Sequence, residues 1–359
     1  MKNKKKVYIA LASEQDKGPL EHINAILSNQ HEKFYFISNL SESCINTNKY
    51  CTYKRVSSKS YFYLQIKILL ILFKSKSSSL ALIRHSVGLI IPYLYFIITL
   101  SRPILEVNGF TPQDLKDREK ALPIRFLNFL IEFFVLHLSQ KIIIVHENLI
   151  ELYTKRYFLP RKKFMVIHNG INKVKLDRVQ SYSNKKTLGY LGSLAQREGV
   201  DLLIAHFSKL DKDFYELLII GGSENEYQQI CTKNYSNIKY YPNMSRSKAL
   251  EELQKVDICV HLRRPLTGKN DSQGMPLKML DYLYLNKPVI ASNVQSYKFI
   301  GEKDFGLLID PYSAEEFFTA IEEIYSRREF KTLSSQAFIE SNFIWEQQVH
   351  KLNMQWSNK

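Results

Sequence analysis

Cysteine is scarce in this sequence. The 359 residues contain four cysteines, and none stands in a Cys-x-x-Cys pair or at the spacing of a zinc site. The spacing permits a bridge between Cys44 and Cys51, but the first residues run directly into the strand-like segment KVYIALA, and nothing there resembles a secretory signal. We therefore expect reduced thiols in a cytoplasmic protein rather than a disulfide framework.

Long apolar runs are also missing. The longest, Val87–Leu100, has 14 residues and contains Pro92. A second run, Phe126–Leu138, is interrupted by polar side chains: Asn128, Glu132 and His137. Both are shorter than the ~20 residues that a helix needs to cross hydrocarbon. We expect buried or interfacial helices at these places and no membrane span.

Acidic residues are few in the first half of the chain. Residues 1–180 hold 28 Lys and Arg against 13 Asp and Glu, whereas the remainder holds 22 of each sign. Residues 51–100 have seven basic side chains and no acidic one. Such charge suits nucleic acid, anionic lipid or a polyphosphate substrate, or it serves solubility alone. The apolar segments between the charges favour an anionic lipid surface over nucleic acid.

The length and the pattern of the chain predict two α/β domains. The sequence is 45% hydrophobic and 13% aromatic, which is enough for two cores and excludes disorder. Strand-like and helical segments alternate, which is typical of doubly wound parallel sheets. Strands are expected at KVYIALA, KFYFIS, PILEV, KIIIV and FMVIH, and, after a polar stretch at residues 174–186, at TLGYLGS, ELLIIGG, NIKYYP, DICVHL, PVIAS and GLLID. Ligands of such domains are expected at the carboxyl ends of the strands.

The segment LGYLGSLAQREGVDLLIAHF, residues 188–207, predicts a strand, a glycine turn and a helix that begins near Gly199. A turn of this kind points free N–H groups and the positive end of the helix dipole at a ligand, which suits a diphosphate. Gly192 and Ser193 form the turn, and Arg197 adds a positive charge. Glycine is common in strand–helix turns, so the segment alone does not specify phosphate binding.

The segment DSQGMPLKMLDYLYLNKPVIASN, residues 271–293, predicts a loop and then a second helix. Lysine suits the charge of a phosphate, and a carboxylate can grip both hydroxyls of a ribose. On this helix those two groups are Lys278 and Asp281. Taken by themselves they also fit an exposed ion pair on a surface helix.

Together these segments resemble the donor half of family 4 retaining glycosyltransferases, which have the GT-B fold. The first is similar to the family stretch G-R-L-x-x-x-K-G-V-x-x-L-I-x-A-F, and the second to P-x-K-x-x-E-Y-x-A-x-x-K-P-V-I-A-S. VIHNGIN, GLLIDPYSAEEFFTAI and FIWEQQ also match in order, and PILEVNG and KIIIVHEN match more loosely. The resemblance implies two Rossmann-like domains that face each other across a cleft. We place the acceptor domain at 1–178, with a helix at about 343–359 packing back on it, and the nucleotide-sugar domain at 179–342.

The site departs from the family pattern at several positions. The E-x7-E pair stands here as Gln273 and Asp281, and the resemblance gives Asp281 the ribose role. The phosphate-binding Arg and Lys of the family fall on Ser193 and Glu198, so Arg197 and Lys278 are the expected replacements. The resemblance implies that the loop residues Gly274, Met275, Pro276 and Leu277 bind the donor, that Gln273 meets its sugar, and that Gly18 and Asn108 lie on the acceptor side.

The implied reaction is a sugar transfer from a nucleotide sugar that needs no divalent metal or other cofactor. The expected acceptor is a lipid-linked saccharide, at the inner face of a bacterial membrane, in capsule, O-antigen or lipopolysaccharide assembly. Asp211 and Asp213 form a D-x-D motif, which reads as a solvated loop. His85, His146 and His168 flank apolar strands or helices, and these three are expected to be structural.

Three alternatives remain open at this stage. A GT-B sugar-nucleotide epimerase needs a catalytic carboxylate and histidine set, which the sequence does not reveal. A nucleic-acid-binding protein predicts aromatic and basic recognition motifs, which are absent, and leaves the C-terminal pattern unexplained. An inactive nucleotide-binding protein is compatible with Gln273.

Overall fold

The computed structural model describes residues 6–15, 17–75, 80–117, 119–174, 184–265, 275–327 and 334–357. The chain forms two compact units. The first comprises the described residues up to Asn172 and those from Trp345 onward, and the second comprises the described residues between Lys173 and Ile344.

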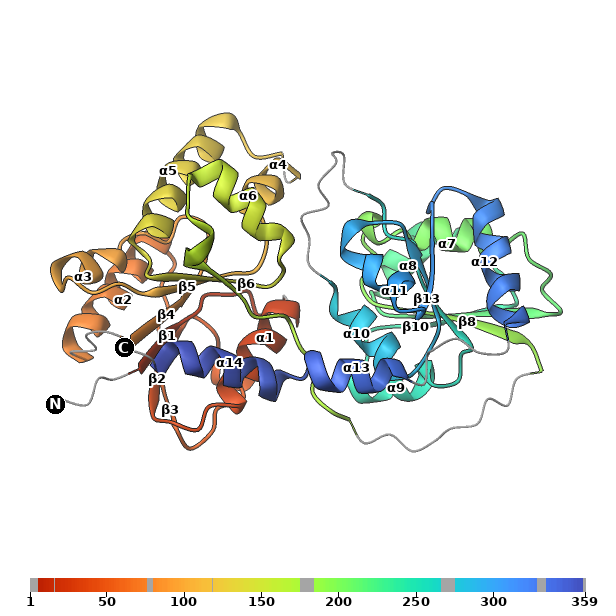
Figure 1. The fold of residues 1–359 in the computed structure, drawn as a ribbon, viewed down its shortest axis with the longest axis horizontal. Helices are drawn as coiled ribbons and strands as arrows, with labels where there is room; N and C mark the ends of the chain where they lie inside the picture. The colour runs from red at the N-terminus through yellow and green to blue at the C-terminus, as the bar shows by residue number, and fades with distance from the viewer. Residues whose placement is uncertain are drawn as a thin grey trace. The chain divides into compact units, whose positions relative to one another are not determined.

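In the first unit, seven parallel strands form one sheet in the order β3-β2-β1-β4-β5-β6-β7 (Figure 1). The strands are β1 (Lys6–Ile9), β2 (Phe34–Ser38), β3 (Cys51–Arg55), β4 (Leu80–Arg84), β5 (Ile104–Val107), β6 (Lys141–Ile144) and β7 (Phe164–Val166). The direction of strand addition reverses between β1 and β4, which is where sheets of this class bind ligands.

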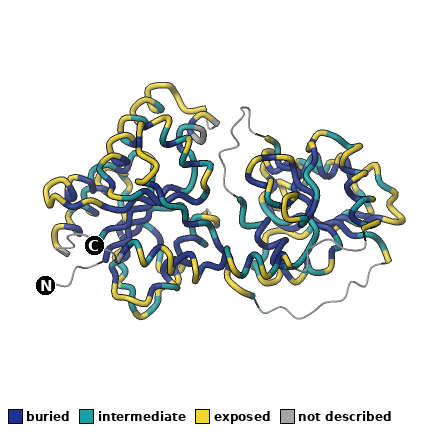
Figure 2. The backbone as a smooth tube through the Cα atoms, in the orientation of Figure 1, coloured by how far each residue is buried: buried dark blue, intermediate teal, exposed yellow. Residues whose placement is uncertain are grey.

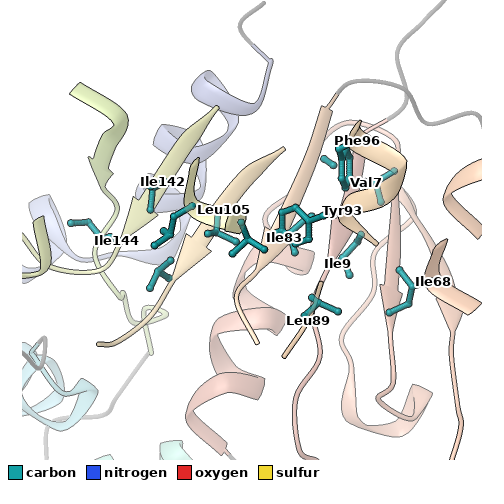
Figure 3. Packing of buried hydrophobic residues seen from close by; sticks show 14 of the residues in the cluster. Val7, Ile9, Ile68, Ile83, Leu89, Tyr93, Phe96, Leu105, Ile142 and Ile144 are labelled. Carbon is teal, nitrogen blue, oxygen red and sulfur yellow. The ribbon is translucent and has the colours of Figure 1, made fainter. Parts of the chain in front are cut away.

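Side chains on alternate strand positions build a core on each face of this sheet, because successive side chains of a strand point to opposite faces. Val7 and Ile9 belong to one cluster, part of which Figure 3 shows, and Tyr8 belongs to the other. The helices of the unit are α1 (Lys17–Ser28), α2 (Tyr61–Ser75), α3 (Tyr93–Ile98), α4 (Thr111–Asp117), α5 (Leu122–Leu138), α6 (Asn148–Tyr157) and α14 (Trp345–Ser357).

The C-terminal helix α14 packs against α1 and β4 of the first unit. Its two tryptophans, Trp345 and Trp356, are buried in the same cluster as Tyr8 and Phe34. The Trp356 indole N–H donates to the Leu80 carbonyl at 2.7 Å, so the buried ring also satisfies its polar group.

The second unit repeats the arrangement with six parallel strands in the order β10-β9-β8-β11-β12-β13. These are β8 (Lys186–Leu191), β9 (Tyr215–Ile220), β10 (Ile238–Tyr241), β11 (Ile258–His261), β12 (Val289–Ser292) and β13 (Gly306–Ile309). Its helices are α7 (Val200–Phe207), α8 (Glu224–Ile230), α9 (Arg246–Leu253), α10 (Leu277–Tyr284), α11 (Lys298–Glu302), α12 (Ala314–Ser326) and α13 (Ser335–Asn342).

Figure 2 shows that burial is concentrated in the strands of both sheets. All eleven segments that we expected to be strands contain one, and the two doubly wound parallel sheets of the prediction are confirmed. Strands β3 and β4 were not predicted from the sequence. Of the two apolar runs, Val87–Leu100 contains α3 and Phe126–Leu138 lies in α5.

Candidate functional site

The candidate site of the second unit lies beside the reversal point of its sheet, between β8 and β11. β8 ends at Leu191 and is followed by Gly192, and a short 3-10 helix, Gln196–Glu198, leads into α7. His261 ends the neighbouring strand β11, and Lys278 lies in the first turn of α10. Side-chain contacts join these elements.

Lys278 is the centre of these contacts. Its Nζ lies 2.8 Å from Glu198 Oε2 and 2.8 Å from the Tyr190 hydroxyl. The side chain is only 10% exposed, so the ammonium group has exchanged most of its water for protein groups. An ammonium has three N–H bonds, and within the described residues these contacts use two of them. The remaining N–H bond is therefore available to a ligand.

The buried carboxylate of Glu198 is held from a second side by His261, whose Nε2 lies 3.0 Å from Glu198 Oε2. Burial would raise the pKa of Glu198, but the hydrogen bond from His261 and the charge of Lys278 hold it well below its usual range. Burial, reinforced by the charge of Lys278, lowers the pKa of His261 to about 3. The imidazole is therefore neutral, with its proton on Nε2.

The other ring nitrogen of His261 fixes this tautomer. Because Nε2 donates to the carboxylate, Nδ1 is an acceptor, and the Tyr297 hydroxyl donates to it at 2.9 Å. On the opposite side of Lys278, the Tyr190 hydroxyl donates to the Ser193 carbonyl at 2.5 Å. Each hydrogen bond in this series thus has a defined donor and acceptor. The ammonium of Lys278 is held by Glu198 on one side and by Tyr190 on the other.

Gly192 is the point where the backbone comes closest to the ammonium. Its φ is +141°, and a Cβ built there would lie 2.4 Å from Lys278 Nζ. Gly199, at the start of α7, has φ +69°, and its Cβ would lie 1.7 Å from the Leu262 carbonyl oxygen. Both positions therefore need glycine, for space as well as for backbone conformation.

Two arginines lie near Lys278. Arg197 Nε contacts Glu198 Oε1 at 3.2 Å, but 59% of the Arg197 side chain is exposed, so most of its guanidinium faces solvent. The buried Arg263, just after β11, lowers the pKa of Lys278 through its charge, as a smaller contribution after burial. Arg197 can therefore turn its exposed guanidinium toward an anion beside Lys278.

The structure places Asp281, the expected ribose ligand, in a buried ion pair. Arg246 Nε lies 3.1 Å and its Nη2 2.5 Å from Asp281 Oδ1. Burial raises the pKa of this carboxyl, and Arg246 opposes the rise. Leu277 begins α10, directly after Met275 and Pro276. The other two donor-side candidates, Gln273 and Gly274, lie outside the described residues.

A second polar cluster lies in the first unit, around Glu106 on β5. The carboxylate, which is 2% exposed, accepts hydrogen bonds from Asn108 at 2.6 Å and Tyr8 at 3.2 Å, pairs with His22 Nε2 at 2.8 Å and pairs with Arg84. Burial would raise the pKa of Glu106, but the charges of His22 and Arg84 hold it well below its usual range. The cluster lies beside the reversal between β1 and β4.

The acceptor-side candidates differ in their surroundings. The Asn108 Oδ1 atom is buried and has no hydrogen-bond partner among the described residues, although its Nδ2 is bonded to Glu106. Gly18, in the first turn of α1, has no heavy atom within 4 Å of a Cβ built on it. Asn108 therefore offers an acceptor atom to a ligand, and Gly18 offers open space.

Sequence reasoning missed most of the groups that hold Lys278. Glu198 was noticed only as a departure from the family pattern, and His261, Tyr297 and Arg263 were not considered. One signal was available: a carboxylate, Glu198, replaces the family lysine in the first motif, while Lys278 keeps the lysine of the second. A new carboxylate in a phosphate site needs a cationic partner, and Lys278 was the nearest candidate by motif.

The first unit also carries an apolar surface on α2, α3 and α5. Its large exposed hydrophobic side chains include Phe62, Tyr63 and Leu70 on α2, Leu94 and Ile98 on α3, and Leu122, Phe126 and Leu127 on α5. Yet no helix in the described part of the chain is long and apolar enough to cross a membrane. The described residues also contain no cluster of three or more His, Cys, Asp or Glu side chains that could hold a metal ion.

Comparison with known proteins gives a family match in the second unit and solved structures with the same fold as the whole chain. Residues 185–327 match the family model described as glycosyl transferases group 1. That match falls within the unit that contains the Lys278 contacts. No curated protein matches the chain.

Solved structures match over nearly the whole chain. Sucrose-phosphate synthase from Thermosynechococcus elongatus is 13% identical, with a TM-score of 0.71 and 98% of each chain covered. HepE from Anabaena, in complex with UDP and glucose, is 11% identical, with a TM-score of 0.71 and coverage of 98% and 99%. The lipopolysaccharide outer core galactosyltransferase WaaB is 12% identical, with a TM-score of 0.69 and coverage of 98% and 99%.

At these identities the likeness establishes the fold, which is GT-B, as predicted. The family match and the glycosyltransferase structures of the same fold support a transferase enzyme.

Proposed function

We propose that this protein is a retaining glycosyltransferase of family 4. It moves a sugar from a nucleotide-sugar donor to a lipid-linked saccharide, at the inner face of the cell membrane, in the assembly of a cell-surface glycan such as capsule, O-antigen or lipopolysaccharide. The observation that carries the proposal is the fixed ammonium of Lys278, held against Gly192 at the reversal point of the second sheet. UDP in the related HepE structure is consistent with a nucleotide donor.

In this reaction the bond between the sugar C1 and the diphosphate breaks, and C1 bonds to an acceptor hydroxyl oxygen. The departing phosphate oxygen takes the acceptor proton, so the protein need not supply a base. Lys278 and Arg197 stabilise the charge that grows on the diphosphate, because fixed charges in a site with little water require no rearrangement. No metal ion is required in this scheme, and we expect a chelator to leave the rate unchanged.

Asp281 binds the ribose hydroxyls in this proposal. Arg246 holds one carboxylate oxygen, Oδ1, and thereby fixes the orientation of the carboxyl group toward the nucleoside. On the acceptor side, Asn108 presents its unpartnered Oδ1 to a hydroxyl group.

The structure brings a carboxylate and a histidine together, as an epimerase would need, in two places. Glu198 and His261 form one pair, but this carboxylate also binds Lys278 and its pKa is depressed. Glu106 and His22 form the other pair. However, this carboxylate also bonds Arg84, Asn108 and Tyr8, and its pKa is depressed. A carboxylate so fully engaged is a poor base, and transfer remains the favoured reaction.

The first test is a thermal-shift screen against UDP-, GDP-, ADP- and CMP-sugars, with nucleic acid as the control. A ligand that binds the folded state alone raises the melting temperature, so one donor class should stabilise the protein. Stabilisation by nucleic acid alone would refute the proposal. Slow hydrolysis of that donor, lost in Asp281→Ala while the protein stays folded, would support it.

A further inference from the structure

We propose that a groove on the first unit, lined from α5 and α6, binds a phosphomonoester group carried by a glycolipid acceptor. The groove has a volume of about 670 Å³ and is lined by Phe110, Leu122, Arg125, Phe126, Phe129, Leu152, Lys155 and Arg156. A smaller adjoining cavity of about 170 Å³ shares four of these residues: Phe110, Arg125, Phe129 and Arg156. This inference rests on the proposed transfer to a lipid-linked acceptor.

Three cations line the groove. The Arg156 guanidinium lies over the Phe129 ring at 5.3 Å and the Tyr157 ring at 5.8 Å, so aromatic faces hold it in place. Lys155 pairs with Glu151 at 2.5 Å, and both side chains are largely exposed. In the part of the chain that the structure describes, Arg125 has no ion pair, so its charge is available.

The charge of the groove fits a phosphomonoester. Arg125, Lys155 and Arg156 carry three positive charges, and Glu151 offsets one, which leaves about two to balance the two negative charges of the phosphate. Guanidinium groups suit this ligand because their N–H bonds match the spacing of phosphate oxygens.

One wall of the groove is apolar and continues on α5 outside it. Leu122 and Phe126 line the groove, and Leu127 and Leu130 are exposed on the same helix. The exposed residues of α5 include no acidic side chain, since Glu132 is buried. A lipid can therefore place its phosphate in the groove while its hydrocarbon chain contacts α5, as at the surface of a membrane.

The groove also lies close to the acceptor-side residue. Phe110 lines the groove and follows Asn108 by two positions, just beyond the end of β5. The Tyr153 hydroxyl of α6 donates to the intervening Gly109 carbonyl at 2.9 Å. Because α6 carries Lys155 and Arg156, this bond connects the cationic helix to the loop that carries Asn108 (Figure 1 shows α5 and α6).

The test is binding of the full-length protein to vesicles of zwitterionic phospholipid that contain a small share of polyprenyl phosphate. Vesicles of equal total charge made with phosphatidylglycerol separate a phosphate site from general attraction to an anionic surface. We compare the wild type with Arg125→Gln/Arg156→Gln and with Lys33→Gln/Lys54→Gln. The control pair removes the same charge from exposed positions of the same unit, near β2 and on β3.

The wild type should prefer polyprenyl phosphate, and the arginine variant should bind it roughly 25-fold more weakly, from about 1 kcal/mol for each arginine. Equal binding to both vesicle types, or equal losses in both variants, would overturn the inference. So would concentration-dependent dimerisation that the arginine variant abolishes, or competition by inorganic phosphate as strong as by the lipid.

If the double variant does not fold, Arg125→Gln alone serves, since no described ion pair holds Arg125. Donor hydrolysis by the same preparations separates this inference from the proposed function. If the arginine variant hydrolyses the donor and binds the lipid as the wild type does, the groove proposal is refuted and the proposed transferase function is not. If the wild type does not hydrolyse any donor but still binds the lipid selectively, the proposed transferase function is refuted and the groove proposal is not.

Discussion

The carboxylate of Glu198 and the ammonium of Lys278 form a buried ion pair, with Oε2 and Nζ 2.8 Å apart, between residues 80 positions apart in the sequence. The resemblance places a family lysine at the position of Glu198 and another at that of Lys278, so in this chain a carboxylate faces the lysine that is kept. This ion pair is buried and has little water around it. Removal of either partner would therefore leave the other charge buried and unpaired.

The interdependence of this pair can be measured. Glu198→Leu leaves a buried ammonium without its partner, and Lys278→Met leaves a buried carboxylate, so each should cost about 3–5 kcal/mol of folding free energy. The double variant should lose much less than the sum of the two. Urea unfolding of all four proteins gives the coupling, and losses that add within about 0.5 kcal/mol would contradict the described pair.

The same variants separate stability from function. The double variant regains stability but has no ammonium, so donor hydrolysis should remain lost in it. Recovery of hydrolysis together with stability would mean that Lys278 is a structural residue and not part of the donor site.

His261 should make the folded protein sensitive to acid. Burial depresses its folded pKa to about 3, below the ~6.5 of the unfolded chain. Between these values the unfolded state binds the additional proton, so stability decreases as the pH falls from ~6.5 toward ~3. His261→Asn should reduce that slope by up to ~1.4 kcal/mol per pH unit. The exposed His31→Gln is the control, and equal slopes in both variants would contradict the role of His261.

Gly192→Ala should impair the site more than it impairs the fold. The new methyl group would occupy the position of the Lys278 ammonium at a φ of +141°, so the ammonium must move. A displacement of about 1 Å at a catalytic group can cost on the order of 10²-fold in rate. Donor hydrolysis is the measurement, and Gly88→Ala, also at a positive φ (+75°) but with the nearest heavy atom 3.6 Å from the new methyl group, is the matched control. Wild-type activity in Gly192→Ala would exclude Lys278 from the site.

Glu106→Gln should destabilise the first unit. It removes the negative charge that Arg84 and His22 face while both stay buried, and we expect a loss of about 3–5 kcal/mol. Because the folded pKa of Glu106 is depressed, its contribution is complete above the unfolded pKa of a glutamate and decreases as the pH falls below it. The exposed Glu42→Gln should have almost no effect in the same thermal unfolding assay. A loss of equal size in Glu42→Gln would refute a special role for Glu106.

Most of the fold was predictable from the sequence because strands that are buried on both faces consist of nearly continuous apolar residues, as in KIIIV. The edge strand β3 escaped notice because it pairs with β2 alone and its sequence, CTYKR, is largely exposed. β4 is buried between β1 and β5, but its run LALIR is short and ends in a basic residue.

The site was predictable only in part. Glycine turns and helix starts depend on nearby residues, so Gly192 and the start of α10 followed from local patterns. Lys278 bonds Glu198 and Tyr190, which are 80 and 88 positions away in the sequence, and Glu198 in turn bonds the histidine at the end of β11. A sequence pattern does not show such proximity. Ion pairing of Asp281 with Arg246 was missed for the same reason.

The position of α14 has a consequence for how the protein is made. Its tryptophans fill the core of the first unit beside Tyr8 and Phe34, yet they leave the ribosome after every described strand of the second unit. During synthesis the core of the first unit therefore stays incomplete until α14 has been made, whereas the second unit can fold earlier. A chain truncated before Trp345 and released from the ribosome should have a protease-resistant second unit and a first unit that is still cleaved, the reverse of the usual order from the N-terminus.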